Sequence, residues 1–142
     1  QVSYACLMDT QTTINAILDE TRCIAVIGAS DKPHRAVYGV MQMLQSHGYR
    51  CLPVNPRLAG HTLLGETVYA RLADIPEPVD TVDMFINSEA AGKLTDEAIA
   101  IGAKSIWMQL DVINEPAAER ARAAGLKVVM DRCPAIELRK RN

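Results

Sequence analysis

Residues suited to phosphate binding occur first in the segment GASDKP, residues 28–33, which follows an apolar run and precedes a helical pattern. Gly28 permits a tight turn and close approach of a phosphate, and the amides of a helix N-terminus favour anions. The spacing Gly28-x-Ser30 is only a fragment of the dinucleotide fingerprint G-x-G-x-x-G. The segment alone therefore indicates either a phosphate-binding turn or an ordinary turn between a strand and a helix.

A second candidate lies where the next predicted strand ends, in the segment PVNPR at residues 53–57. NAD-binding proteins place Asp or Glu at this point, where it accepts hydrogen bonds from the ribose hydroxyls. This sequence has no acid there, and Arg57 could instead pair with a ribose phosphate. The residue types favour CoA, with its 3′-phosphate, or NADP, with its 2′-phosphate. The alternative is that Arg57 is a solvated loop charge.

Residues for catalysis are harder to find. A catalyst needs a nucleophile or an acid–base pair in reach of its substrate. None of His34, His47 and His61 has a serine, cysteine or carboxylate at the spacing of a dyad. Three aspartates are expected at different edges of the sheet and so form no metal cluster: Asp80, Asp83 and Asp131. We therefore expect no catalytic and no metal-ligating residues.

Three functions stay open at this point. The first is a module that binds CoA or acyl-CoA without its own turnover. The second is an NADP-binding reductase or redox sensor, which the incomplete glycine fingerprint and the lack of a Tyr-x-x-x-Lys pair disfavour. The third is a subunit that docks on a larger acyl-CoA enzyme. The sequence leaves the acyl group and the oligomeric state open.

The four cysteines indicate a reducing compartment. Cys6, Cys23, Cys51 and Cys133 form no C-x-x-C pair and have no zinc-ligand spacing. We expect Cys23 and Cys51 to be buried thiols in neighbouring strands, and Cys133, after a strand at the ligand edge, to react first. The N-terminus lacks the features of a signal peptide. The expected location is the cytoplasm.

The pattern that must position these residues is an alternation of strands and helices. Gly48, Gly102 and Gly125 each follow a helical pattern and precede an apolar run, as helix-ending glycines do. Strands are expected at residues 23–28, 50–55, 81–86, 104–110 and 127–131. Helices are expected at residues 12–20, around 37–44 and 94–101, and at 116–124, with a short one at 69–72. The alternation predicts an α/β, Rossmann-like three-layer αβα domain with a five-stranded parallel sheet in the order 3-2-1-4-5.

Composition agrees with a single domain over residues 1–142, in which about the first 11 residues are expected to be flexible. Fifteen Lys and Arg against seventeen Asp and Glu give a net charge of −2, which argues against nucleic acid as a partner. No apolar run approaches the length needed to span a bilayer. A small molecule is therefore the expected partner.

Several segments in order resemble a known family, the stand-alone CoA-binding proteins of the YccU type. These segments are VIGASDKP (26–33), PVNPR (53–57), VDMF (82–85), IAIGAK (99–104), NE (114–115) and DRC (131–133). That family is similar to the N-terminal CoA-binding domain of the succinyl-CoA synthetase α subunit. The resemblance covers about residues 14–138 and implies a Rossmann-like fold with CoA across the strand ends.

The resemblance also implies roles for individual residues. Gly28, Ala29 and Ser30 would meet the pyrophosphate, and Lys32 and Arg35 belong to the same predicted cofactor site. The adenosine 3′-phosphate end would contact Val54, Asn55, Pro56 and Arg57. The pantetheine path would be lined by Phe85 and Ser88.

The sequence departs from the family pattern at three places. Ile86 stands where the family usually carries Arg, Asp111 where it often has Gly, and Ala36-Val37 where it has Pro-Ser. The first departure concerns the pantetheine end more than the adenosine end. Asp111 adds a negative charge near the edge where a polyanion would bind.

Overall fold

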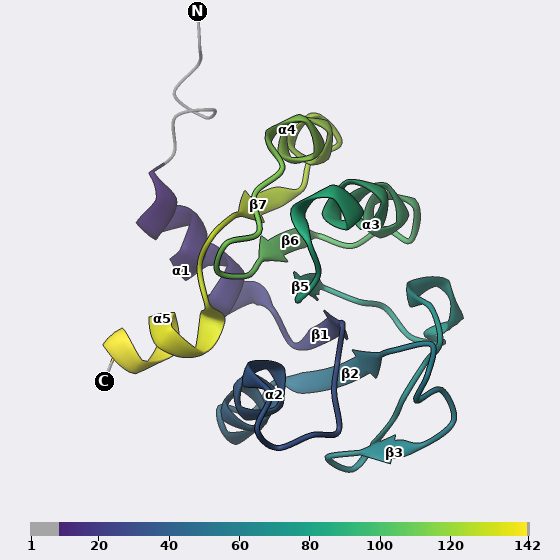
Figure 1. Ribbon diagram of the computed structural model, residues 1–142. Helices are drawn as coiled ribbons and strands as arrows, with labels where there is room; N and C mark the ends of the chain where they lie inside the picture. Colours follow the sequence, from purple (N-terminus) through teal and green to yellow (C-terminus); the bar gives the residue numbers. More distant parts are fainter. Residues whose placement is uncertain (1–8, 142) are drawn as a thin grey trace, which may run out of the picture.

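A five-stranded parallel sheet forms the centre of the computed structural model, which describes residues 9–141 (Figure 1). Its strands, in spatial order, are β2 (Arg50–Val54), β1 (Cys23–Ile27), β5 (Thr81–Met84), β6 (Ser105–Met108) and β7 (Lys127–Val129). The helices are α1 (Thr10–Glu20), α2 (Ala36–Ser46), α3 (Ser88–Ala100), α4 (Glu115–Ala123) and α5 (Pro134–Lys140). The predicted α/β, Rossmann-like class is confirmed.

Helices cover both faces of the sheet and create two apolar cores. On one face α1, α2 and α5 pack against the sheet around Met41, Leu44 and Trp107, all of which are buried. On the other face α3 and α4 present small residues, among them Ala98 and Ala121, which let the helices approach the strands closely. The predicted three-layer arrangement therefore holds, and strands buried on both faces explain the nearly continuous apolar runs in the sequence.

The predicted strand order 3-2-1-4-5 is wrong. Numbered along the chain, the five strands lie in the order 2-1-3-4-5, because β5 pairs with β1 and not with β2. β2 is thus an edge strand, which suits Pro53, since proline has no N–H to give to a second neighbour. This is the other common order of doubly wound sheets.

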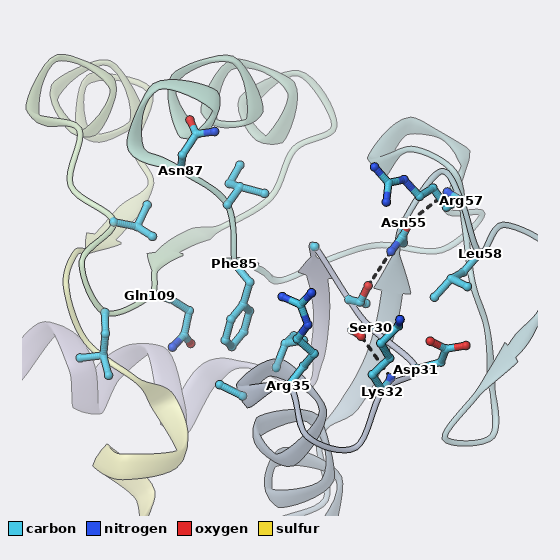
Figure 2. A pocket seen from close by; sticks show the side chains of 17 residues that line it. Ser30, Asp31, Lys32, Arg35, Asn55, Arg57, Leu58, Phe85, Asn87 and Gln109 are labelled. Carbon is cyan, nitrogen blue, oxygen red and sulfur yellow. Dashed lines mark hydrogen bonds between the residues drawn. The ribbon is translucent and has the colours of Figure 1, made fainter.

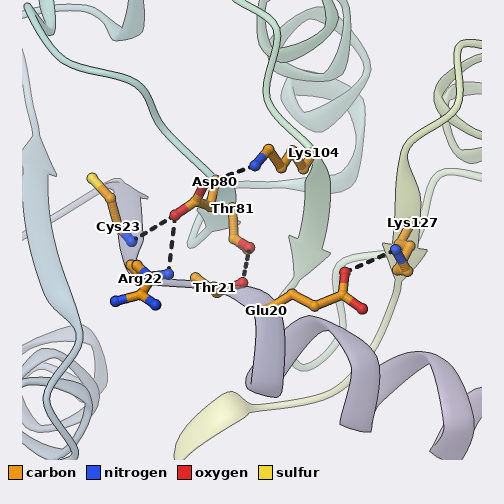
Figure 3. A network of polar contacts seen from close by, with 8 residues as sticks. All are labelled: Glu20, Thr21, Arg22, Cys23, Asp80, Thr81, Lys104 and Lys127. Atoms are coloured by element: carbon orange, nitrogen blue, oxygen red, sulfur yellow. Dashed lines mark hydrogen bonds and ion pairs between the residues drawn. The ribbon is translucent and has the colours of Figure 1, made fainter.

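Polar contacts at the amino ends of the strands fasten β5 beside β1 (Figure 3). The Asp80 carboxylate accepts hydrogen bonds from the backbone N–H groups of Arg22 and Cys23, both at 3.0 Å. Next to these groups in the chain, the hydroxyls of Thr21, just before Arg22, and Thr81, just after Asp80, are 2.7 Å apart in the buried interior. These bonds favour β5 as the neighbour of β1, whereas the apolar character of the strands would suit several neighbours equally.

The outer edge of β2 is occupied by the long connection to β5. Tyr69 pairs with Val54 there, its N–H donating to the Pro53 carbonyl and its carbonyl accepting from Asn55, each at 2.9 Å. The same connection contains a small hairpin, β3 (Thr62–Leu63) and β4 (Glu66–Thr67), which the sequence analysis did not predict. The helix predicted at residues 69–72 is instead a single 3₁₀ turn at Leu72–Asp74.

The structure also shows whether the cysteines are buried and whether they form disulfides. Cys23, Cys51 and Cys133 are free and buried, whereas Cys6 lies outside the described residues. Cys133 directly precedes α5, a helix that was not predicted, and this packing removes the accessibility expected for it. Among residues 9–141, no helix has the length and apolar character needed to cross a membrane.

Candidate functional site

The strand order places a reversal point between β1 and β5, and a cavity of about 670 Å³ opens there at the carboxyl edge of the sheet (Figure 2). Doubly wound sheets hold their ligands at such a point, because the two neighbouring loops leave in opposite directions. The lining residues come from the ends of β1, β2, β5 and β6 and from the start of α2. The volume is typical of a pocket for a small molecule.

Gly28 allows the two loops at this reversal to touch. Its φ is +81°, in the left-handed region that favours glycine. A Cβ at this position would collide with the carbonyl oxygen of Phe85. The β1 loop therefore lies directly against the end of β5, and Phe85 forms part of the cavity wall beside Gly28.

Asn55 joins the loops after β1 and β2. Its side-chain amide donates to the Ala29 carbonyl at 2.7 Å, and its side-chain oxygen accepts from the Arg57 N–H at 2.8 Å (Figure 2). Both bonds connect residues that were predicted to contact the ligand phosphates, in the segments 28–30 and 54–57. Asn55 thus fixes the backbone from which the exposed Arg57 side chain extends.

The N-terminus of α2 faces the cavity with uncapped amides. α1, α3 and α4 each begin with a side chain that accepts a hydrogen bond from the first turn, whereas α2, preceded by Arg35, and α5, preceded by Cys133, have no such cap. Lys32 and Arg35 are exposed and line the same cavity, opposed by the single carboxylate of Asp31. A helix start without a side-chain cap and two cations make this end of the cavity suited to an anion.

A second cavity of about 450 Å³ adjoins the first on the other side of the β1 and β2 ends. The two share Gly28, Asn55, Arg57 and Ile86. The remaining lining residues of the second cavity come from the ends of β1 and β2, the segment that leads into the 3₁₀ turn, and α3: Ile27, Val54, Pro56, Ala70, Arg71, Leu72, Lys93, Leu94 and Glu97. Arg57 therefore stands at the junction of the two spaces.

The opposite end of the first cavity contains a buried acid beneath a pocket residue. Asp83, in the middle of the sheet, is 1% exposed, and burial raises the pKa of its carboxyl well above the usual range. The side-chain amide nitrogen of Gln109, oriented toward this carboxyl, donates to its two oxygens at 3.0 and 3.3 Å. Gln109 lines the cavity, so this pairing holds part of the cavity floor in place.

Most of the predicted site residues meet in these two cavities. The first is lined by Gly28, Ala29, Ser30, Lys32, Arg35, Asn55, Arg57 and Phe85, and the second adds Val54 and Pro56. Ser88 lines neither cavity. Its hydroxyl instead accepts from the Ile113 N–H at 3.0 Å, which ties α3 to the loop after β6.

The contributions of β6 and of the long connection to the cavities were not predicted from the sequence. Gln109 and Leu110 follow a strand directly, which is a usable signal for the ligand edge, but neither was singled out as a binding residue. Arg71 and Lys93 carried no signal, because only the tertiary fold brings the connection and α3 beside Arg57. Within residues 9–141, no group of three His, Cys, Asp or Glu side chains could hold a metal ion.

Comparison with known proteins identifies similar chains. Residues 22–139 match the family described as CoA binding domain. The Bacillus subtilis protein YneT, itself described as uncharacterized, is 34% identical over 120 residues, covering 84% of this chain and 87% of that protein. A hypothetical protein from Pyrococcus horikoshii is 36% identical in its solved structure, with a TM-score of 0.86 over 93% of this chain and 92% of that one.

A larger enzyme contains a similar domain. The dinucleotide-forming acetyl-coenzyme A synthetase 1 of Ca. Korarchaeum cryptofilum, solved with phosphate and ADP, is 25% identical with a TM-score of 0.64. The match covers 75% of this chain but only 25% of the synthetase. The present chain therefore corresponds to one part of that enzyme.

Proposed function

Because the chain belongs to the CoA-binding domain family, we propose that it binds coenzyme A, free or acylated, at the carboxyl edge of the sheet as a module without its own turnover. The observation that carries the proposal is the convergence of Gly28, the uncapped start of α2 and Arg57 around two joined cavities. These features supply a close backbone approach, free amides and a guanidinium, which are the groups that bind phosphates.

The two cavities suggest how the ligand lies. In this pose the pyrophosphate meets Gly28, Ala29 and Ser30 at the start of α2, with Lys32 and Arg35 nearby. The adenosine occupies the second cavity, where the Leu72 and Leu94 side chains offer apolar contact. The pantetheine extends through the first cavity toward Phe85. The ribose phosphate then falls at the junction of the cavities.

Arg57 is the residue on which the choice of ligand depends. It lines both cavities, and the Asn55 side chain fixes its backbone. A guanidinium at this junction can form two charge-assisted hydrogen bonds with the 3′-phosphate of CoA, contributing roughly 1.5–3 kcal/mol. We expect Arg57→Ala to weaken CoA binding about ten- to a hundredfold, and to change the affinity for 3′-dephospho-CoA little.

Calorimetric titration of CoA, dephospho-CoA and NADP into the wild type and Arg57→Ala tests the proposal. Arg22→Ala is a matched control, because Arg22 is an exposed arginine at the opposite end of β1. Equal affinity of the wild type for CoA and dephospho-CoA would refute the phosphate argument. Tighter binding of NADP than of CoA would favour an NADP-binding reductase or redox sensor instead.

The absence of turnover is part of the proposal. His34, His47 and His61 are exposed, and none of them lines either cavity. We expect the pure protein to leave acyl-CoA thioesters intact, and repeated hydrolysis of any acyl-CoA would contradict this. The cytoplasm remains the proposed compartment, because Cys23 and Cys51 are free thiols, which reducing compartments preserve.

A further inference from the structure

The two ends of the first cavity differ in charge. Its lysine and arginines come from the loops after β1 and β2, where the phosphates are proposed to bind. Among the described residues, the lining contributed by the ends of β5 and β6 contains no Lys or Arg: Phe85, Ile86, Asn87, Gln109, Leu110 and Val112. The second end therefore offers apolar surface and neutral amide side chains, and its described lining contributes no cationic side chain.

Large apolar side chains are exposed at the rim of this end. Leu110 lines the cavity with 51% of its surface exposed, and Ile113, three residues on, is 48% exposed. Apolar side chains that are exposed beside a cavity can form part of a ligand-binding surface. Leu110 extends the apolar wall formed by Phe85 and Ile86 toward solvent.

The loop that carries Leu110 and Ile113 is fixed in this conformation. Asp111 has a φ of +67°, which is strained for a residue other than glycine, and its N–H donates to the Asp131 carboxylate at 2.7 Å. The Ser88 hydroxyl accepts from the Ile113 N–H at 3.0 Å. The exposed apolar rim is thus held in place by hydrogen bonds to Asp131, in the segment after β7, and to Ser88, at the start of α3.

We propose that this rim binds the acyl chain of an acyl-CoA and that it selects uncharged, apolar acyl groups over dicarboxylic ones. The inference rests on the proposed function, because in that pose the pantetheine thiol emerges at the end of β5 and β6. An acyl chain on the thiol would continue along Ile86 and Leu110. The exposed Asp111 carboxylate, beside Leu110 in the chain, would repel a terminal carboxylate on the ligand.

Titration calorimetry with acetyl-CoA, octanoyl-CoA, butyryl-CoA and succinyl-CoA tests the inference. Burial of only two further methylenes corresponds to about tenfold in affinity, so octanoyl-CoA should bind at least about tenfold more tightly than acetyl-CoA. Leu110→Ser should reduce this ratio about fivefold. Ile101→Ser is the matched control, because Ile101 is an exposed isoleucine at the C-terminus of α3 and lines neither cavity.

Charge selection has its own pair of ligands and its own variant. Butyryl-CoA and succinyl-CoA both carry four-carbon acyl groups, and the wild type should prefer butyryl-CoA about threefold or more. Asp111→Asn should reduce that preference, since asparagine tolerates a positive φ and keeps the backbone while it removes the charge. Thermal melting of each variant checks that it remains folded.

The outcomes separate the two proposals. If none of the thioesters and no free CoA binds, the proposed function itself fails. If CoA binds but octanoyl-CoA gains nothing over acetyl-CoA, only the acyl-chain inference fails. An equal effect of Leu110→Ser and Ile101→Ser on the octanoyl-CoA ratio would also overturn it. An equal affinity for succinyl-CoA and butyryl-CoA would overturn the charge selection.

Discussion

Replacing Gly28 with alanine should damage both stability and ligand binding, and the structure supplies a glycine that separates the causes. Gly28 and Gly48 have similar positive φ values, +81° and +90°. An added Cβ at Gly48 would meet nothing within 4 Å, whereas at Gly28 it would collide with the Phe85 carbonyl oxygen. Gly48→Ala therefore measures the cost of the backbone conformation alone, and Gly28→Ala adds the cost of the collision.

The magnitudes follow from these two contributions. The left-handed conformation costs an alanine about 1–2 kcal/mol, partly offset by about 0.4–1 kcal/mol from the reduced entropy of the unfolded chain. Gly48→Ala should thus lower the free energy of unfolding by roughly 1 kcal/mol. Overpacking typically costs a further ~1–3 kcal/mol, so Gly28→Ala should lower it by about 2–4 kcal/mol.

Urea unfolding of the wild type and both variants, followed by circular dichroism, compares their free energies of unfolding. Differences in the urea midpoint report differences in stability only if the three proteins have equal m-values. Calorimetry adds a second readout. Gly28→Ala should weaken CoA binding, because Phe85 lines the cavity, and Gly48→Ala should not, because Gly48 precedes β2 at the opposite edge. If the two variants lose the same stability within about 0.5 kcal/mol, the β5 loop yields without cost and the argument for close contact is wrong.

Two further predictions concern buried titratable groups. Burial raises the pKa of the Asp83 carboxyl. The contribution of Asp83 to stability is therefore greatest below about pH 4, where the unfolded chain also holds the proton, and it declines as pH rises toward the raised pKa. In urea unfolding, Asp83→Asn should lose less stability between pH 4.5 and 8 than the wild type does. Burial also raises the pKa of Cys23 to about 11 and that of Cys51 to about 12. In a Cys6→Ser variant, these two thiols and the buried Cys133 should therefore react with a thiol reagent at pH 8 only as fast as the protein unfolds locally or globally. Rapid labelling of the native protein would contradict their placement in the core.

The sequence by itself determined the class of fold, because the signals for it are local. Helix-ending glycines, the N-cap Asn114 and the uninterrupted apolar strands all act within a few residues of the chain. The same local reasoning singled out the turn at Gly28 and the arginine at the end of the second strand, both of which line the first cavity. The sequence also contained a clue to the strand order that the prediction did not use, since Pro53 is suited to an edge strand and not to the interior position that the order 3-2-1-4-5 assigned.

Tertiary structure alone decided which strands are neighbours and what completes the site. The bonds that hold β5 beside β1 join Asp80 to residues 22 and 23, almost sixty positions earlier, and no local pattern encodes such a pairing. The second cavity exists because the connection from β2 folds back along the free edge of that strand and brings Arg71 near Arg57. Ser88 illustrates the same limit, because its hydroxyl braces the loop after β6, a contact set by how α3 packs and not by the residue type.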